Sequence, residues 1–176
     1  MSSFQQLVRA RRSHRRFTEE PVSEGDLQTL LRAALMAPTG HGARAWQFIT
    51  VRDADTLAFL STVRPAGSAF LKGAAAVVAV LGEPQAQSTW IEDGAIAAVT
   101  MQYQAQDLGL GSCWCQIRGR EGTADGKTAE DLVRGRLGIP AQYSVLCLVG
   151  FGHPADERKP QDEAALKWDQ VHTEGF

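Results

Sequence analysis

The chain is organised around the stretch Arg11-Arg12-Ser13-His14-Arg15-Arg16-Phe17. The stretch holds four arginines and one hydroxyl group, and the first acidic residue of the chain is Glu19. Arginine presents a planar fork of N–H donors that matches phosphate oxygens, and serine adds a further donor. The stretch by itself leaves three interpretations open: a phosphate site, a solvated basic helix face and a nucleic-acid patch.

Length and composition indicate a globular protein with one local basic cluster. The 176 residues are 44% hydrophobic and 22% charged, which is typical of a folded domain with a real core, so we expect a single domain over residues 1–176. The formal net charge is −2. A nucleic-acid-binding protein is usually basic over much of its surface, so we expect no nucleic-acid partner.

The sequence also argues against a metal site, a disulfide framework and a membrane span. The three cysteines (Cys113, Cys115 and Cys147) are an odd, sparse set, and the four histidines lack metal-ligand spacing. No apolar run follows the basic start, and the most apolar run, residues 73–82, has about half the length of a membrane helix. These observations predict a cytoplasmic protein without a bound metal and without membrane contact.

Hydrophobic periodicity predicts an intermixed set of helices and strands. Apolar residues at helical spacing and capping residues predict helices, and apolar or alternating runs predict strands. The predicted helices are residues 4–10, 27–36, 54–60, 91–108 and 129–137, and the predicted strands are residues 46–51, 74–81, 112–117 and 143–149. We expect loops at residues 38–42, 64–68 and 150–160. Because the elements lack a regular βαβ rhythm, the class is α+β.

Two glycine motifs invite comparison with dinucleotide-binding sites. Gly109-Leu110-Gly111 follows a predicted helix, whereas the dinucleotide fingerprint requires a strand before the glycines. Gly150-Phe151-Gly152-His153-Pro154-Ala155 does follow a strand, but Pro154 and the charged run after it prevent the required helix. We therefore expect no Rossmann-type site.

Several stretches, in the same order along the chain, resemble the FMN-dependent nitroreductase family. The opening basic stretch is similar to the family pattern R-R-S-x-R-x-F, and residues 90–115 resemble its long central helix with the ending G-L-G-x-x-W. The remaining matches are Ala37-Pro38-Thr39-Gly40-His41-Gly42-Ala43-Arg44-Ala45-Trp46-Gln47-Phe48-Ile49, Gly138-Ile139-Pro140 and Gly150-Phe151-Gly152-His153-Pro154. Together they span nearly the whole chain.

The resemblance implies a fold, an assembly and an activity. The implied fold is a three-layer αβα sandwich with a central, mostly antiparallel sheet, and the implied assembly is a homodimer with FMN at the interface. NADH or NADPH would reduce FMN, which would then reduce a small-molecule acceptor of the nitroaromatic or quinone type, giving ping-pong kinetics. The alternative is a non-catalytic flavin-binding protein of the same fold, for sensing or storage.

The resemblance also implies roles for particular residues. The phosphate and ribityl chain would contact the basic stretch, the partner subunit would supply one loop, and one strand would pass the flavin ring. The residues are Arg11, Arg12, Ser13 and Arg15 for the phosphate; Pro38, Thr39 and Gly40 for the partner loop; Trp114, Cys115 and Gln116 for the ring; and Arg158 or Lys159 at a late basic position. His14 and Arg16 are expected bystanders. No catalytic side chain is expected, because the flavin itself carries the hydride chemistry.

The loop of residues 38–46 departs from the family pattern. Gly42, Arg44 and Ala45 stand where the family has Asn, Gln and Pro. Arg44 is therefore a candidate replacement for the missing side-chain contacts to the flavin. A guanidinium at the pyrimidine edge would favour anionic reduced flavin and raise its reduction potential.

Overall fold

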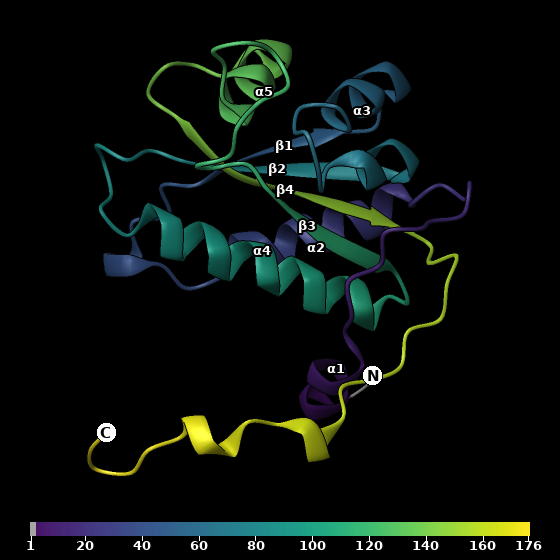
Figure 1. The fold of residues 1–176 in the computed structure, drawn as a ribbon, viewed down its shortest axis with the longest axis vertical. Coiled ribbons are helices and arrows are strands. Elements are labelled where there is room, and N and C mark those ends of the chain that lie inside the picture. The colour runs from purple at the N-terminus through teal and green to yellow at the C-terminus, as the bar shows by residue number, and fades with distance from the viewer. Residues whose placement is uncertain (1–2) are drawn as a thin grey trace.

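The computed structural model describes residues 3–176 and has three layers with a β-sheet in the middle (Figure 1). Four strands form the sheet in the order β1-β2-β4-β3, and every pairing is antiparallel. The strands are β1 (Gln47–Val51), β2 (Ala76–Gly82), β3 (Gly111–Gln116) and β4 (Ser144–Gly152). β3 is therefore an edge strand. The predicted α+β sandwich with an antiparallel sheet is confirmed.

Helices cover both faces of the sheet. One face packs against α2 (Glu24–Leu35) and α4 (Trp90–Asp107), and the other packs against α3 (Ala54–Leu60) and α5 (Ala129–Leu137) (Figure 1). All seven residues of β2 are buried, which explains its continuous apolar run. Successive side chains point to opposite faces, so Val78 joins the core under α2 and α4 while Val77 joins the core under α3 and α5.

Side-chain caps set the starts of three helices. The side chains of Ser23, Asp53 and Thr128 each accept a hydrogen bond from a backbone N–H in the first turn of α2, α3 and α5. Each predicted helix and strand is present, with ends that differ by at most three residues. Short 3-10 turns at Gly40–Gly42 and Ala69–Gly73 were not predicted.

Small residues form part of the buried face of α4. Gly94, Ala97 and Met101 are buried, whereas Val99 is 37% exposed. A Cβ atom on Gly94 would lie 2.7 Å from Leu146 Cδ2, so this glycine lets the helix approach β4 closely. The same helix also packs against α2, with which it shares one hydrophobic core.

β4 runs three residues further than the sequence predicted and includes Gly150 and Gly152. Gly150 pairs with Val77 of β2, and Gly152 pairs with Gly111 of β3. A Cβ atom on Gly152 would lie 2.9 Å from the Phe17 ring, and one on Gly150 would lie 3.0 Å from Phe70. These glycines therefore make room for packed aromatic rings within a strand, and the predicted loop begins only after Gly152.

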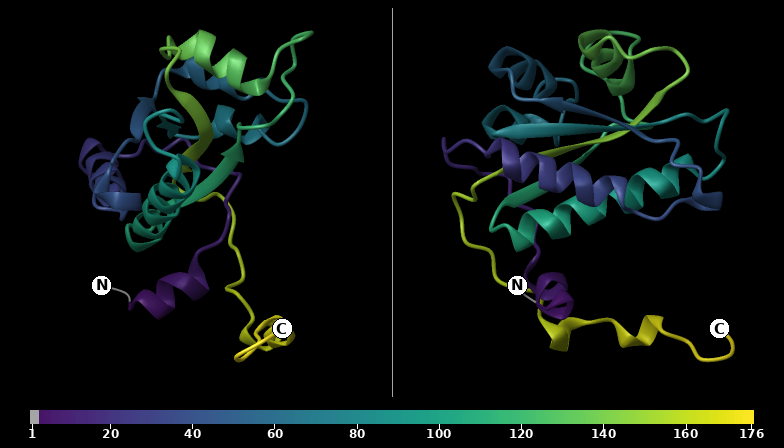
Figure 2. Two further views of the ribbon diagram at one scale, coloured as in Figure 1. Left: turned by 90° about the vertical axis from the view of Figure 1, so that its left-hand side faces the viewer. Right: turned by 180° about the vertical axis from the view of Figure 1, so that it is seen from behind.

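The first described residues and the last residues of the chain lie outside the three layers, on the same side of the molecule (Figures 1 and 2). We call residues 3–18 and 153–176 the terminal arms. The first arm contains α1 (Phe4–Ala10), none of whose residues is buried, and the second contains 3-10 turns at Glu163–Ala165 and Trp168–Gln170. Backbone hydrogen bonds join the arms from Thr18 N–H to His153 O, from Ala155 N–H to Arg16 O and from Gln161 N–H to Arg9 O.

Candidate functional site

The basic stretch lies in extended conformation beside the outer edge of β3. Ser13 forms a parallel bridge with Ser112, and the His14 N–H donates to Ser112 O at 3.0 Å. Side chains of an extended backbone point alternately to opposite sides. The odd-numbered residues Arg11, Ser13 and Arg15 therefore share one side, and the even-numbered residues share the other.

The odd-numbered side chains gather around Cys113 of β3; we call Arg11, Ser13 and Arg15 the basic rim. Burial raises the pKa of the Cys113 thiol, while the charge of Arg15, the Ser13 hydroxyl and the charge of Arg11 act in the opposite direction. Within residues 3–176 neither Arg11 nor Arg15 forms an ion pair. Two guanidinium groups and a hydroxyl thus converge without an acidic partner, which is the donor set of an anion site.

The even-numbered side chains hold the second terminal arm. Arg12 Nη1 donates to Lys159 O at 2.7 Å, and His14 Nδ1 lies 3.2 Å from Asp156 Oδ1. Asp156 also forms an ion pair with Arg158, in which Oδ2 lies 2.7 Å from Nη2. Arg12 and the backbone of Lys159 therefore join the two arms, whereas Arg158 pairs with Asp156 inside the second arm. Arg12, and either Arg158 or Lys159, were predicted at the phosphate. His14, an expected bystander, is only 9% exposed.

Asp156 is the anionic centre of this contact. The hydrogen bond with His14 lowers the pKa of the Asp156 carboxyl below its ordinary value, and the charge of Arg158 lowers it further. The carboxylate is consequently charged throughout the neutral range. It pairs with Arg158, whereas the two arginines of the basic rim form no ion pair within residues 3–176.

The free edge of β3 continues from the basic rim. The backbone carbonyl of Ser112 accepts from His14, and that of Gln116 accepts from Arg64, so both carbonyls point away from β4. Because the backbone groups of a strand alternate in direction, those of Trp114 also point away from β4. The side chains of Trp114 and Gln116 are partly exposed and joined by a hydrogen bond of 3.0 Å from Trp114 Nε1 to Gln116 Oε1.

Of the three residues predicted at the flavin ring, Cys115 is placed differently from its neighbours. Its side chain is 1% exposed and belongs to the core under α3 and α5. Burial raises the pKa of the Cys115 thiol, and the nearby Arg64 offsets part of this effect. The open edge is thus formed by Trp114 and Gln116, while the Cys115 thiol packs inward.

Arg64 is a residue of this region that the sequence analysis did not select. Its Nη1 atom donates to Gln116 O at 2.9 Å and lies 4.0 Å from Cys115 Sγ. The turn at Gly67, where φ is +89°, brings the backbone against the guanidinium. The available signal was an arginine in a short loop with no acidic residue within eight positions on either side.

The loop predicted to approach the flavin from the partner lies far from the basic rim of its own chain. The Gly40 N–H donates to Asp93 Oδ1 at 2.8 Å, at the first turn of α4. The first terminal arm contacts the last turns of the same helix, where Phe4 packs on Tyr103 at 5.5 Å. These 18 residues of helix span about 27 Å. The rim and Pro38, Thr39, Gly40 and Arg44 therefore do not meet within one chain.

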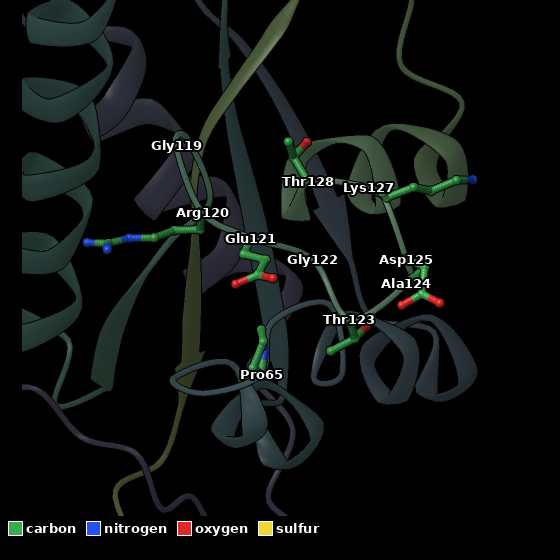
Figure 3. A pocket seen from close by; sticks show the side chains of 11 residues that line it. Pro65, Gly119, Arg120, Glu121, Gly122, Thr123, Ala124, Asp125, Lys127 and Thr128 are labelled. Atoms are coloured by element: carbon green, nitrogen blue, oxygen red, sulfur yellow. The ribbon is translucent and has the colours of Figure 1, made fainter.

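A hollow of about 840 Å³ opens next to the Gln116 end of β3 (Figure 3). It is lined by Pro65, which follows Arg64, and by the loop of residues 119–128 that follows β3. Thr123 Oγ1 donates to Thr62 O at 2.8 Å and fixes one side of this loop. Arg120 extends away from Asp125 and Lys127 (Figure 3).

The part of the chain that the structure describes contains neither a metal-binding cluster nor a membrane-spanning helix. Residues 3–176 contain no group of three or more His, Cys, Asp or Glu side chains that could hold a metal ion. Among the same residues, every helix is too short or too polar to cross a membrane.

The fold and this edge define an α+β protein with an antiparallel sheet and two arginines beside its edge strand. Comparison with known proteins assigns the class: the model of the nitroreductase family matches residues 8–66 and 59–153. The chain belongs to the nitroreductase family.

Individual relatives agree with this assignment. A structure of an FMN-dependent nitroreductase from Clostridium difficile R20291 is 37% identical, covers 97% of this chain and 98% of its own, and superposes with a TM-score of 0.94. A protein from Archaeoglobus fulgidus, named provisionally as an NADH dehydrogenase/NAD(P)H nitroreductase, is 29% identical over 96% of this chain and 95% of its own. A nitroreductase-like protein from Desulfovibrio desulfuricans, solved with FMN, shares the fold at 23% identity, with a TM-score of 0.78 and coverage of 100% and 99%.

Proposed function

We propose that this chain is an FMN-dependent oxidoreductase that uses NADH or NADPH to reduce nitroaromatic or quinone-type acceptors. The observation that carries the proposal is the basic rim, which forms no ion pair within residues 3–176 and lies at the start of the free edge of β3. The cofactor and the electron donor are those for which the relatives are named.

The residues present fit FMN at both of its ends. Arg11, Ser13 and Arg15 would hold the phosphate, because charge-assisted hydrogen bonds contribute about 1.5–3 kcal/mol each. The outward backbone N–H groups of Trp114 and Gln116 would hydrogen-bond the ring. FMN, when bound, supplies the hydride chemistry. The protein orients it, and the rim neutralises its phosphate.

We further propose that the active form is a homodimer. The loop containing Thr39, Gly40 and Arg44 lies at the opposite end of α4 from the basic rim, so a site that uses both requires a second copy. The terminal arms present large apolar side chains to solvent, among them Phe4, Trp168 and Val171. A second copy of the chain would cover these side chains and bring its loop to the rim.

Steady-state kinetics test the catalytic part of the proposal. One site that serves the donor and the acceptor in turn gives parallel lines when reciprocal rates are plotted against reciprocal donor concentration at several acceptor concentrations. Lines that intersect would argue against this order. The alternative, a flavin-binding protein without turnover, predicts bound FMN and no rate above the uncatalysed reaction. A cytoplasmic location is a separate expectation, checked by fractionation.

A further inference from the structure

Arg64 is a partly buried cation with no acidic partner in residues 3–176. Its guanidinium carries five N–H donors, and the partners seen in this part of the chain, Gln116 O and Cys115 Sγ, are both reached through Nη1. Removing a cation from water is unfavourable unless it gains compensating contacts. The arrangement therefore suits a ligand that brings electron-rich oxygen or nitrogen atoms to the remaining donors.

The position of Arg64 is fixed by its surroundings. The Ser68 hydroxyl, which is fully buried, donates to Ser61 O at 2.8 Å and lies 3.4 Å from Arg64 O. The Gln116 carbonyl holds the other end of the side chain at 2.9 Å. A charge anchored at both ends needs little reorganisation when a neighbouring group changes its own charge.

We propose that Arg64 stabilises reduced FMN more than oxidised FMN and so raises the reduction potential of the bound cofactor. The inference rests on the proposed function. Hydride transfer from a nicotinamide moves two electrons and one hydrogen to the flavin and releases the nicotinamide as its oxidised cation, so the ring gains one negative charge. A fixed cation at the Gln116 end favours that charge by Coulomb attraction.

The structure favours Arg64 over Arg44 for this role. Arg44 is exposed, and its described contact is from its backbone N–H to Thr39 Oγ1 at 3.2 Å. Arg64, in contrast, touches the strand that carries the predicted ring contacts.

The test compares Arg64→Gln, Arg64→Lys and the control Arg120→Gln. Glutamine keeps a donor for Gln116 O without the charge, and lysine keeps the charge. Arg120 is exposed and extends away from Asp125 and Lys127 (Figure 3). Dissociation constants of oxidised and dithionite-reduced FMN, and the midpoint potential against a reference dye, are measured for each purified full-length variant.

We expect Arg64→Gln to weaken the binding of reduced FMN at least tenfold more than the binding of oxidised FMN. For a two-electron couple, this difference lowers the midpoint potential of the bound flavin by about 30 mV. The midpoint potential of Arg64→Lys should stay close to the wild-type value, and that of Arg120→Gln should equal it. Equal weakening of both forms in Arg64→Gln, or an unchanged potential, overturns the role of Arg64 and leaves the proposed function intact. A wild-type protein that binds no FMN overturns the proposed function, and this inference with it.

Discussion

At the scale of single residues, the backbone conformation divides the arginine cluster into two functions. The extended stretch places Arg11, Ser13 and Arg15 toward β3, and Arg12 and His14 toward the second terminal arm. Composition alone identified the cluster but not this division, because the alternation depends on a bridge to Ser112, a partner 99 positions away in sequence. Arg64 was missed for the same reason, since its partner Gln116 is 52 positions away.

The division makes a prediction for cofactor retention. Arg15→Ala should weaken FMN binding by roughly 10- to 150-fold, because it removes a charge-assisted hydrogen bond of about 1.5–3 kcal/mol. Arg16→Ala should change the dissociation constant little, since Arg16 points to the other side of the stretch. Fluorescence titration of the apoprotein with FMN measures both variants. Equal losses in the two would contradict the assignment of the rim.

Asp156 gives a prediction for the pH dependence of stability. Its pKa is lower in the folded protein than in the unfolded chain, so its stabilising effect is complete above about pH 4 and is lost as the pH falls through the folded-state value. Asp156→Asn should lower the melting temperature at pH 7. The difference between variant and wild type should shrink as the pH falls from about 5 to 3. A difference that stays constant with pH would show that the carboxylate charge is not responsible.

At the scale of elements, periodicity and caps predicted each helix and strand, because these signals are local. The largest difference at the end of a strand arose where a distant partner determines the structure. β4 continues through Gly150 and Gly152 because neighbouring strands pair with both. A glycine in a sequence usually suggests a loop. In β4, the missing side chain of each glycine leaves space for a packed aromatic ring.

Two glycine substitutions test this packing. Gly152→Ala should destabilise the fold by about 1–3 kcal/mol, because the new Cβ would lie 2.9 Å from the Phe17 ring. Gly135→Ala is the matched control: it lies inside α5 with nothing within 4 Å of its Cβ position, so it should stabilise by about 0.5–1 kcal/mol. Urea unfolding measures both. A stabilising Gly152→Ala would show that β4 has room at this position.

At the scale of the whole molecule, the terminal arms are the part of the single chain that exposes large apolar side chains to solvent. They project from the sandwich in all three views (Figures 1 and 2), and Trp168 is 70% exposed. The sequence predicted a dimer only through the family resemblance, because exposed apolar residues cannot be recognised without the fold. The arms and the loop near Gly40 are the structural features on which the proposed dimer rests.

The arms predict the behaviour of the assembly. The wild type should be a dimer by light scattering after gel filtration, and Trp168→Ala should weaken its association by roughly 30-fold, the effect of losing an interface hot spot of about 2 kcal/mol. Phe59→Ala on α3, across the sheet from the arms, is the control and should remain dimeric (Figure 1). A monomeric wild type would contradict the proposed assembly.

The central claim is that this chain binds FMN and passes electrons through it, and the visible spectrum of the purified protein tests it most directly. We predict a flavin spectrum, either as purified or after addition of FMN, that NADH or NADPH bleaches under anaerobic conditions. A quinone or nitroaromatic compound should then restore it. A protein that stays colourless after incubation with FMN, or a bound flavin that neither nicotinamide nucleotide bleaches, would contradict the account.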